Sequence, residues 1–158
     1  MSNSEYKFYM QKCSKTGEPI DGTLKNLEED FENLRYMEAK GIDKIGKVKN
    51  AYTEQYTDSN TLRTWHPSEN GEATTHEATV IELKLLFYGD NRRNVYDEFN
   101  QYILNGYHVF WDTLRNKQFT FVVLEAIEPS EDNFKGGIPY ITCSWKLQNI
   151  KGYTEKIN

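Results

Sequence analysis

The segment that most constrains the fold is residues 78–88, where buried-type and surface-type side chains alternate along the chain. One face of this segment is apolar throughout: Ile81, Leu83, Leu85 and Phe87. The other face mixes charged with apolar side chains: Glu82, Lys84, Leu86 and Tyr88. A period of two predicts a β-strand, and about ten residues is long for a globular protein. Because the second face is partly apolar, we expect it to be covered in an assembly.

Residues 139–148 repeat this alternation, and further strands are predicted at 107–111 and 118–126. In the last strand one face contains Ile141, Cys143, Trp145 and Leu147, and the other includes Tyr140. Between the strands, helical spacing joins Val95, Tyr96, Phe99, Tyr102 and Ile103. This stripe predicts a helix at about 91–104, which Asn105-Gly106 ends.

The first half of the chain has weaker patterns. Residues 1–22 are expected to form an N-terminal arm or strand, and residues 23–34 a short helix with Leu24, Leu27, Phe31 and Leu34 on one face. Residues 41–60 are expected to form a long loop or a hairpin with weak strands, 61–65 a strand and 67–76 a loop. Residues 152–158 are expected to form a flexible tail.

These elements together predict a mainly β (α+β) fold within one domain of residues 1–158. The strands follow one another at hairpin-like spacing, which favours an antiparallel β-sandwich or barrel-like sheets with one packed helix at about 91–104. A short helix near 23–34 is a further candidate. A chain of 158 residues can bury a core without disulfides or metals.

Charge and cysteine content exclude several classes of protein. The formal net charge is −5, unlike the basic footprint of a nucleic-acid binder. The two cysteines, Cys13 and Cys143, lie far apart and outside any CxxC pair, so both are expected to be reduced thiols. The sequence shows no signal peptide and no apolar stretch long enough to span a membrane. We therefore expect the protein to fold in the cytoplasm where it is made.

Sequence motifs for catalysis are missing, which predicts a protein that is not an enzyme. His76-Glu77 does not continue as HExxH because Val80 occupies the position of the second histidine. The three histidines are scattered along the sequence: His66 and His76 are expected in loops and His108 at the start of a strand. No metal site can be assembled from them, and each is interpreted as structural or incidental. No nucleotide-binding or hydrolase motif is present. We predict no catalytic residues, no metal and no cofactor.

The aromatic content favours a binding role instead. The chain contains 11 tyrosines, and tyrosine suits half-buried positions and protein interfaces. Trp65 and Trp111 leave a second hypothesis open, in which the protein is a small β-rich carbohydrate-binding module. The alternative is that both tryptophans anchor the sheet.

Several segments resemble a family of structural proteins from bacteriophages and prophages of gut Bacteroidetes. The resemblance covers about residues 34–150 and is found in Lys47 to Glu54, Thr75 to Thr79, Phe87-Tyr88-Gly89-Asp90, Val95 to Phe99, and Tyr107 to Asn116. The order of strand, helix, strand and hairpin is also similar to the building block of phage tail tubes, distal tail rings and tail-completion proteins. This second likeness is at the level of the fold.

The resemblance implies a subunit of a phage tail, in a virion, that assembles with itself into a ring, often a hexamer. Adjacent tail proteins would be its partners, and double-stranded DNA would pass through the lumen as non-specific cargo. No membrane is involved. The candidate assembly contacts lie on the polar loops and on the second faces of the strands: Lys47, Lys49, Tyr52, Tyr56, Leu86, Tyr88 and Tyr140.

Overall fold

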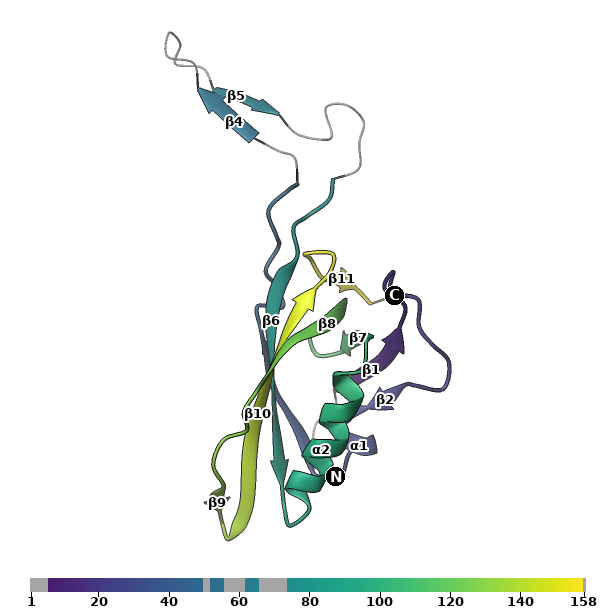
Figure 1. The fold of residues 1–158 in the computed structure, drawn as a ribbon, viewed down its shortest axis with the longest axis vertical. Helices are drawn as coiled ribbons and strands as arrows, with labels where there is room; N and C mark the ends of the chain where they lie inside the picture. The colour runs from purple at the N-terminus through teal and green to yellow at the C-terminus, as the bar shows by residue number, and fades with distance from the viewer. Residues whose placement is uncertain (1–5, 50–51, 56–61, 66–73, 158) are drawn as a thin grey trace.

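A computed structural model describes residues 6–49, 52–55, 62–65 and 74–157 (Figure 1). The strands are β1 (Phe8–Cys13), β2 (Lys25–Asn26), β3 (Leu34–Lys40), β4 (Tyr52–Gln55), β5 (Leu62–Trp65), β6 (Thr79–Tyr88), β7 (Tyr107–Asp112), β8 (Lys117–Ile127), β9 (Asn133–Lys135), β10 (Ile138–Asn149) and β11 (Glu155–Lys156). The helices are α1 (Leu27–Asp30) and α2 (Arg92–Ile103). The fold is mainly antiparallel β with one longer helix, which confirms the predicted class.

One sheet contains nine strands in the order β2-β1-β7-β8-β10-β6-β3, with β11 added to β8 and β9 added to β10. β8 belongs to both halves of this sheet. Its first residues pair with β7, and its later residues, from Phe121 to Ile127, pair with β10. The longest ladder joins β10 to β6 and runs from Tyr140 opposite Tyr88 to Asn149 opposite Thr79.

The two ends of the strand order approach each other across the core, so the sheet folds back on itself. Phe8 of β1 stacks on Tyr36 of β3, with ring centroids 3.9 Å apart. Arg115, in the turn after β7, also donates a hydrogen bond to the Tyr36 hydroxyl at 3.0 Å. The predicted sandwich-like or barrel-like arrangement therefore comes from one strongly curved sheet.

Helix α2 lies against the inner face of the sheet (Figure 1). Phe99 packs edge-on against Trp145, with centroids 5.1 Å apart, and is fully buried. The Trp145 indole N–H donates to Asn100 Oδ1 at 2.9 Å, which satisfies the one polar atom of a buried ring. The prediction of a helix at about 91–104 is thus confirmed, with bounds one residue shorter at each end.

The helix expected near 23–34 is reduced to the single turn of α1. The backbone at Lys25–Asn26 pairs with β1 instead, so the helix cannot begin before Leu27. Leu24 consequently points to solvent and is 51% exposed, whereas Leu27, Phe31 and Leu34 are buried as their spacing predicted.

The first and last described segments of the chain both pair with the sheet, through β1 and β11. β1 is an internal strand that pairs with β2 on one side and β7 on the other. The prediction of a flexible tail at 152–158 is wrong, because β11 pairs with Lys117 and Gln118 of β8. Ile157 N also donates to Asn116 O at 3.2 Å, so backbone bonds hold this end against the sheet.

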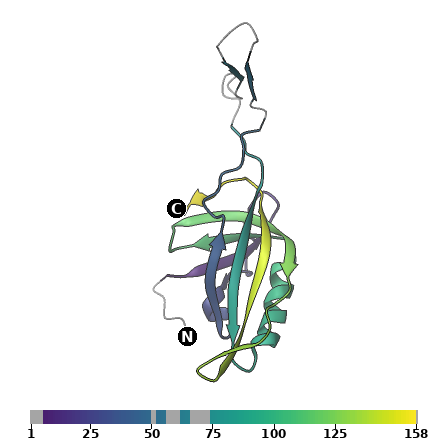
Figure 2. The ribbon, with the colours of Figure 1, turned by 90° about the vertical axis from the view of Figure 1, so that its left-hand side faces the viewer.

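The hairpin of β4 and β5 stands away from the sheet, beyond the N-terminal end of β6 (Figures 1 and 2). Its register places Tyr52 opposite Trp65. The hairpin and the segments that join it to the sheet fall largely within the expected loops at 41–60 and 67–76. Residues 50–51 and 66–73 of the joining segments, and residues 56–61 between the two strands, lie outside the described residues.

Candidate assembly surface

The outer face of the sheet contains an apolar groove of about 510 Å³ near the C-terminal end of β6. Its lining residues come from four strands and are called here the apolar groove: Met37, Leu86, Tyr88, Lys135, Ile138, Tyr140 and Thr142. Antiparallel pairing brings them together, since Tyr140 lies opposite Tyr88 and Thr142 opposite Leu86.

A β-bulge adds Met37 to this face. The pairing of β3 with β6 shifts between Tyr36 and Glu38, so Met37 is the extra residue. A bulge changes the direction in which a side chain points. Tyr36 faces the core and Met37 faces out, with 44% of its surface exposed.

Large apolar side chains in and beside the groove are open to solvent. Met37 is 44% exposed and Ile138 is 51% exposed. Phe134 is 70% exposed but precedes Lys135 by one residue in β9, so its side chain lies on the opposite face of the β9–β10 hairpin and outside the groove. A contiguous exposed patch of this kind marks an interaction surface more often than scattered apolar residues do.

The groove has a basic rim. Lys135 is the charged residue among those that line it, and the Arg35 guanidinium lies 5.8 Å from the centre of the Tyr88 ring. Arg35 Nη1 also lies 4.0 Å from Glu28 Oε2. A ligand or partner with apolar and acidic groups would match this chemistry.

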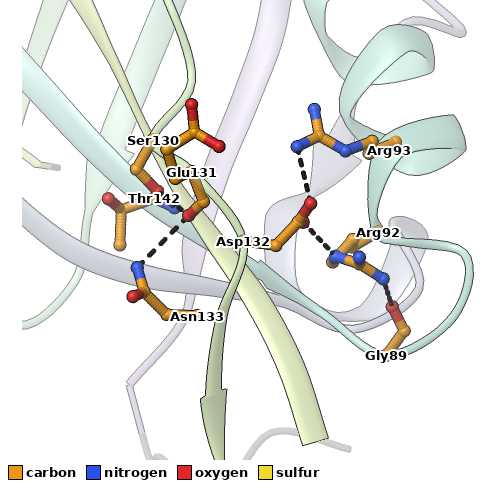
Figure 3. Close-up of polar contacts among 8 residues, drawn as sticks. All are labelled: Gly89, Arg92, Arg93, Ser130, Glu131, Asp132, Asn133 and Thr142. Atoms are coloured by element: carbon orange, nitrogen blue, oxygen red, sulfur yellow. Dashed lines mark hydrogen bonds and ion pairs between the residues drawn. The ribbon is translucent and has the colours of Figure 1, made fainter.

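Ion pairs hold the β9–β10 hairpin against the N-terminus of α2 (Figure 3). Arg92 Nε contacts Asp132 Oδ1 at 2.8 Å, and Arg93 Nη2 contacts Asp132 Oδ2 at 3.0 Å. Hydrogen bonds from these two guanidinium groups lower the pKa of the Asp132 carboxyl. Ser130 fixes the segment before β9 to β10, because its hydroxyl accepts a hydrogen bond from Thr142 N at 3.0 Å. These contacts position the strands that supply Lys135, Ile138 and Tyr140.

A second candidate surface lies at the other end of β6, at the root of the projecting hairpin. Lys47 and Lys49 are exposed there, while their backbones bond to the returning strand: Glu77 N donates to Lys47 O at 2.8 Å, and Lys49 N to Thr75 O at 2.9 Å. Gly46 N donates to Gly152 O at 2.7 Å. The root therefore joins three chain segments.

The structure brings together three of the predicted contacts, Leu86, Tyr88 and Tyr140, in the apolar groove. Lys47 and Lys49 lie beyond the opposite end of β6, which at ten residues is about 30 Å long. Tyr52 belongs to β4, and Tyr56 lies outside the described residues. The predicted residues thus define two surfaces.

Sequence reasoning missed Met37, Lys135 and Ile138. The segment 128–137 is mostly polar, yet it contains β9. Gly136-Gly137 directly before Ile138 is the signal of a hairpin turn that places Lys135 opposite Ile138. The sequence does not predict that Met37 faces outward, because the β-bulge arises from the pairing of β3 with β6.

The metal-binding residue types, the two cysteines and the helices add no further candidate site in the described part of the chain. Among the described residues no cluster of three His, Cys, Asp or Glu side chains could hold a metal ion. Burial raises the pKa of Cys13 to about 11 and that of Cys143 to about 12, so both stay protonated thiols. No helix in the described part of the chain has the length and apolar character needed to cross a membrane.

Trp111 lies on the outer face of the other half of the sheet and is half-buried. It lines two shallow hollows, one beside Tyr9 and Leu24 and one beside Pro19. Its indole N–H donates to Gln118 Oε1 at 2.7 Å, which fixes the ring on the sheet. Trp65 belongs to β5, so the two tryptophans lie on separate parts of the molecule.

The fold and the groove define a mainly β protein with an uncovered apolar face, and a known structure has the same fold. A chain from the structure of the phage P2 baseplate in its activated conformation with Ca is similar with a TM-score of 0.60 and 10% sequence identity. The likeness covers 90% of this chain and 44% of that one, so the protein spans less than half the length of its structural neighbour. No protein-family model and no curated protein sequence matches the chain.

Proposed function

We propose that the protein is a structural subunit of a phage or phage-derived tail that assembles with itself and with adjacent tail proteins. The observation behind this proposal is the apolar groove, in which Met37 and Ile138 are 44% and 51% exposed. Leaving such a surface in water is unfavourable by about 25 cal/mol for each Å² of apolar area. The likeness in fold to a phage baseplate chain supports a tail in particular.

The finer proposal is a ring of subunits in a tail tube or distal tail, with DNA passing through the lumen. Two different surfaces at opposite ends of β6 favour a heterologous contact, in which each copy uses one surface on each neighbour. Such contacts close into rings when the rotation between copies is suitable. The net charge of −5 is compatible with a lumen to which DNA does not adhere. In this proposal the protein does no catalysis and needs no cofactor.

Light scattering after size-exclusion chromatography tests the proposal, together with negative-stain microscopy of the same fractions. We expect ring-shaped oligomers, formed by the protein alone or with the products of neighbouring genes. A protein that stays monomeric at high concentration, and beside those gene products, would contradict it.

A carbohydrate-binding module remains the second candidate, because Trp111 lines two neighbouring pockets on the outer face of the sheet. Stacking of a sugar on the indole would change its fluorescence. Titration with oligosaccharides, compared with the Trp111→Ala variant, distinguishes the candidates: saturable binding by a folded monomer, lost in the variant, favours the module.

A further inference from the structure

We propose that the apolar groove of one copy packs against a second surface, called here the Leu24 surface, of the next copy. The Leu24 surface is a hollow of about 410 Å³ on the outer face of the other half of the sheet, and its lining residues are Tyr9, Gln11, Leu24 and Trp111. This inference rests on the proposed function and adds which two surfaces meet.

The two surfaces point away from each other within one copy. Phe8 of β1 and Tyr36 of β3 stack on one another across the core, on the inner face of the sheet. Because side chains alternate along a strand, Tyr9 faces out on one side of the molecule. Met37 faces out on the other side, at the β-bulge after Tyr36. A groove can therefore meet a Leu24 surface only on a neighbouring copy.

Both surfaces leave apolar side chains in water. Leu24 is 51% exposed, as is Ile138 in the groove. Ile20 is 49% exposed and extends the Leu24 surface, because Gln11 Nε2 donates a hydrogen bond to the Ile20 carbonyl oxygen at 2.9 Å. Tyr9 and Trp111 lie opposite one another in the ladder of β1 and β7. Aromatic residues of this kind are enriched at the centres of protein interfaces.

The charges beside the two surfaces are opposite in sign. Residues 20–32, which include Leu24, contain five acidic residues and one lysine: Asp21, Lys25, Glu28, Glu29, Asp30 and Glu32. Glu28 and Glu29 form ion pairs within the copy, whereas the other three acidic residues are exposed. The groove has Lys135 in its lining and Arg35 beside Tyr88. Opposite charges across an interface guide association and fix its register.

The same charges disfavour the competing arrangements. A two-fold contact between grooves brings Lys135 of one chain close to Lys135 of the other, and one between Leu24 surfaces brings acidic groups together. The root of the projecting hairpin also matches the groove poorly, since its exposed Lys47 and Lys49 have the same sign as the groove rim. The head-to-tail contact pairs opposite charges, and contacts of this type form rings or filaments.

Two variants that each lack one surface test the contact. Leu24→Asp disrupts the Leu24 surface and keeps the groove, and Ile138→Asp does the reverse. We expect each variant alone to be monomeric in light scattering. An equimolar mixture should form a 1:1 dimer, because one intact groove can still meet one intact Leu24 surface.

Leu124→Asp is the matched control, since Leu124 is 54% exposed and lines neither surface. We expect it to assemble like the wild type, and circular dichroism to be unchanged in all three variants. Assembly by either surface variant alone, a mixture that stays monomeric, or equal loss of assembly in Leu124→Asp would overturn the inference.

Photo-crosslinking identifies the occupant independently of these variants. Benzoylphenylalanine replaces Ile138, and this protein is mixed with copies that are ¹⁵N-labelled and lack the crosslinker. We expect labelled crosslinked peptides from within residues 9–32 or from the strand that contains Trp111. Labelled peptides from the groove or from any other segment, or an oligomer without crosslinks, would overturn the inference and leave self-assembly intact. A wild-type protein that is monomeric and gives no labelled crosslinks would contradict the proposed function as well.

Discussion

At the scale of single residues, His108 is the buried group whose protonation matters most. Its ring is fully buried and stacks on Phe121, with centroids 5.6 Å apart. Burial lowers the pKa of this histidine to about 4, from an ordinary value of about 6.5.

We expect the free energy of unfolding to fall as pH decreases from about 6.5 to 4. In that range the unfolded chain binds a proton at His108 and the folded chain does not, so acid favours unfolding. The loss amounts to about 3 kcal/mol between neutral pH and pH 4. Urea unfolding at a series of pH values measures it. His108→Leu should remove this part of the pH dependence, whereas Val109→Ala, at a buried site without a titrating group, should keep it.

Arg115 neutralises a buried carboxylate. Asp112 is fully buried, and its Oδ2 lies 2.8 Å from Arg115 Nη1. We expect Arg115→Ala to lower the free energy of unfolding by about 2–3 kcal/mol, because it leaves a buried charge without its partner. The double variant Asp112→Asn/Arg115→Ala should regain part of that stability in the same urea experiment. A double variant as unstable as the sum of both single changes would argue against the pairing.

At the scale of elements, the sequence predicted those parts whose pattern is local. β6, α2 and β10 follow from alternation or helical spacing over ten or more residues, and their bounds agree within two residues. α1 was predicted too long because β2 pairs with β1 through Lys25–Asn26, which is a tertiary contact. The sequence predicted Leu86, Tyr88 and Tyr140 of the apolar groove but not Met37 or Ile138. These two residues lie beside Leu86 because of the strand order β10-β6-β3, which is a tertiary feature.

The root of the projecting hairpin depends on a close approach at Gly46. A Cβ atom there would lie 1.8 Å from the Glu77 carbonyl oxygen, so any side chain forces the backbones apart. We expect Gly46→Ala to speed amide exchange at Lys49 and Glu77 and to lower the free energy of unfolding by about 1–3 kcal/mol. Gly22 is the control for local contact: its φ of +79° makes an alanine strained, but no atom lies within 4 Å of an added Cβ. Gly22→Ala should therefore leave the pattern of exchange at the root unchanged.

At the scale of the whole molecule, the two faces of one curved sheet differ in character. Its inner face forms a single apolar core with α2, and its outer face keeps an apolar groove beside basic residues. The buried core lies on the first face, so the assembly proposed above would use the second face without disturbing that core. Variants on the outer face should therefore change association without unfolding the subunit.

Thermal unfolding tests that separation. If subunits associate only when folded, mass action stabilises the folded state more as the concentration rises. We expect the wild-type melting temperature to increase with protein concentration and that of Ile138→Asp to stay constant. At the lowest concentration the two proteins should melt within a few degrees of each other, since an exposed substitution changes stability by about 0.5 kcal/mol or less. A wild-type melting temperature that does not vary with concentration would contradict self-association, because a monomer has no such dependence.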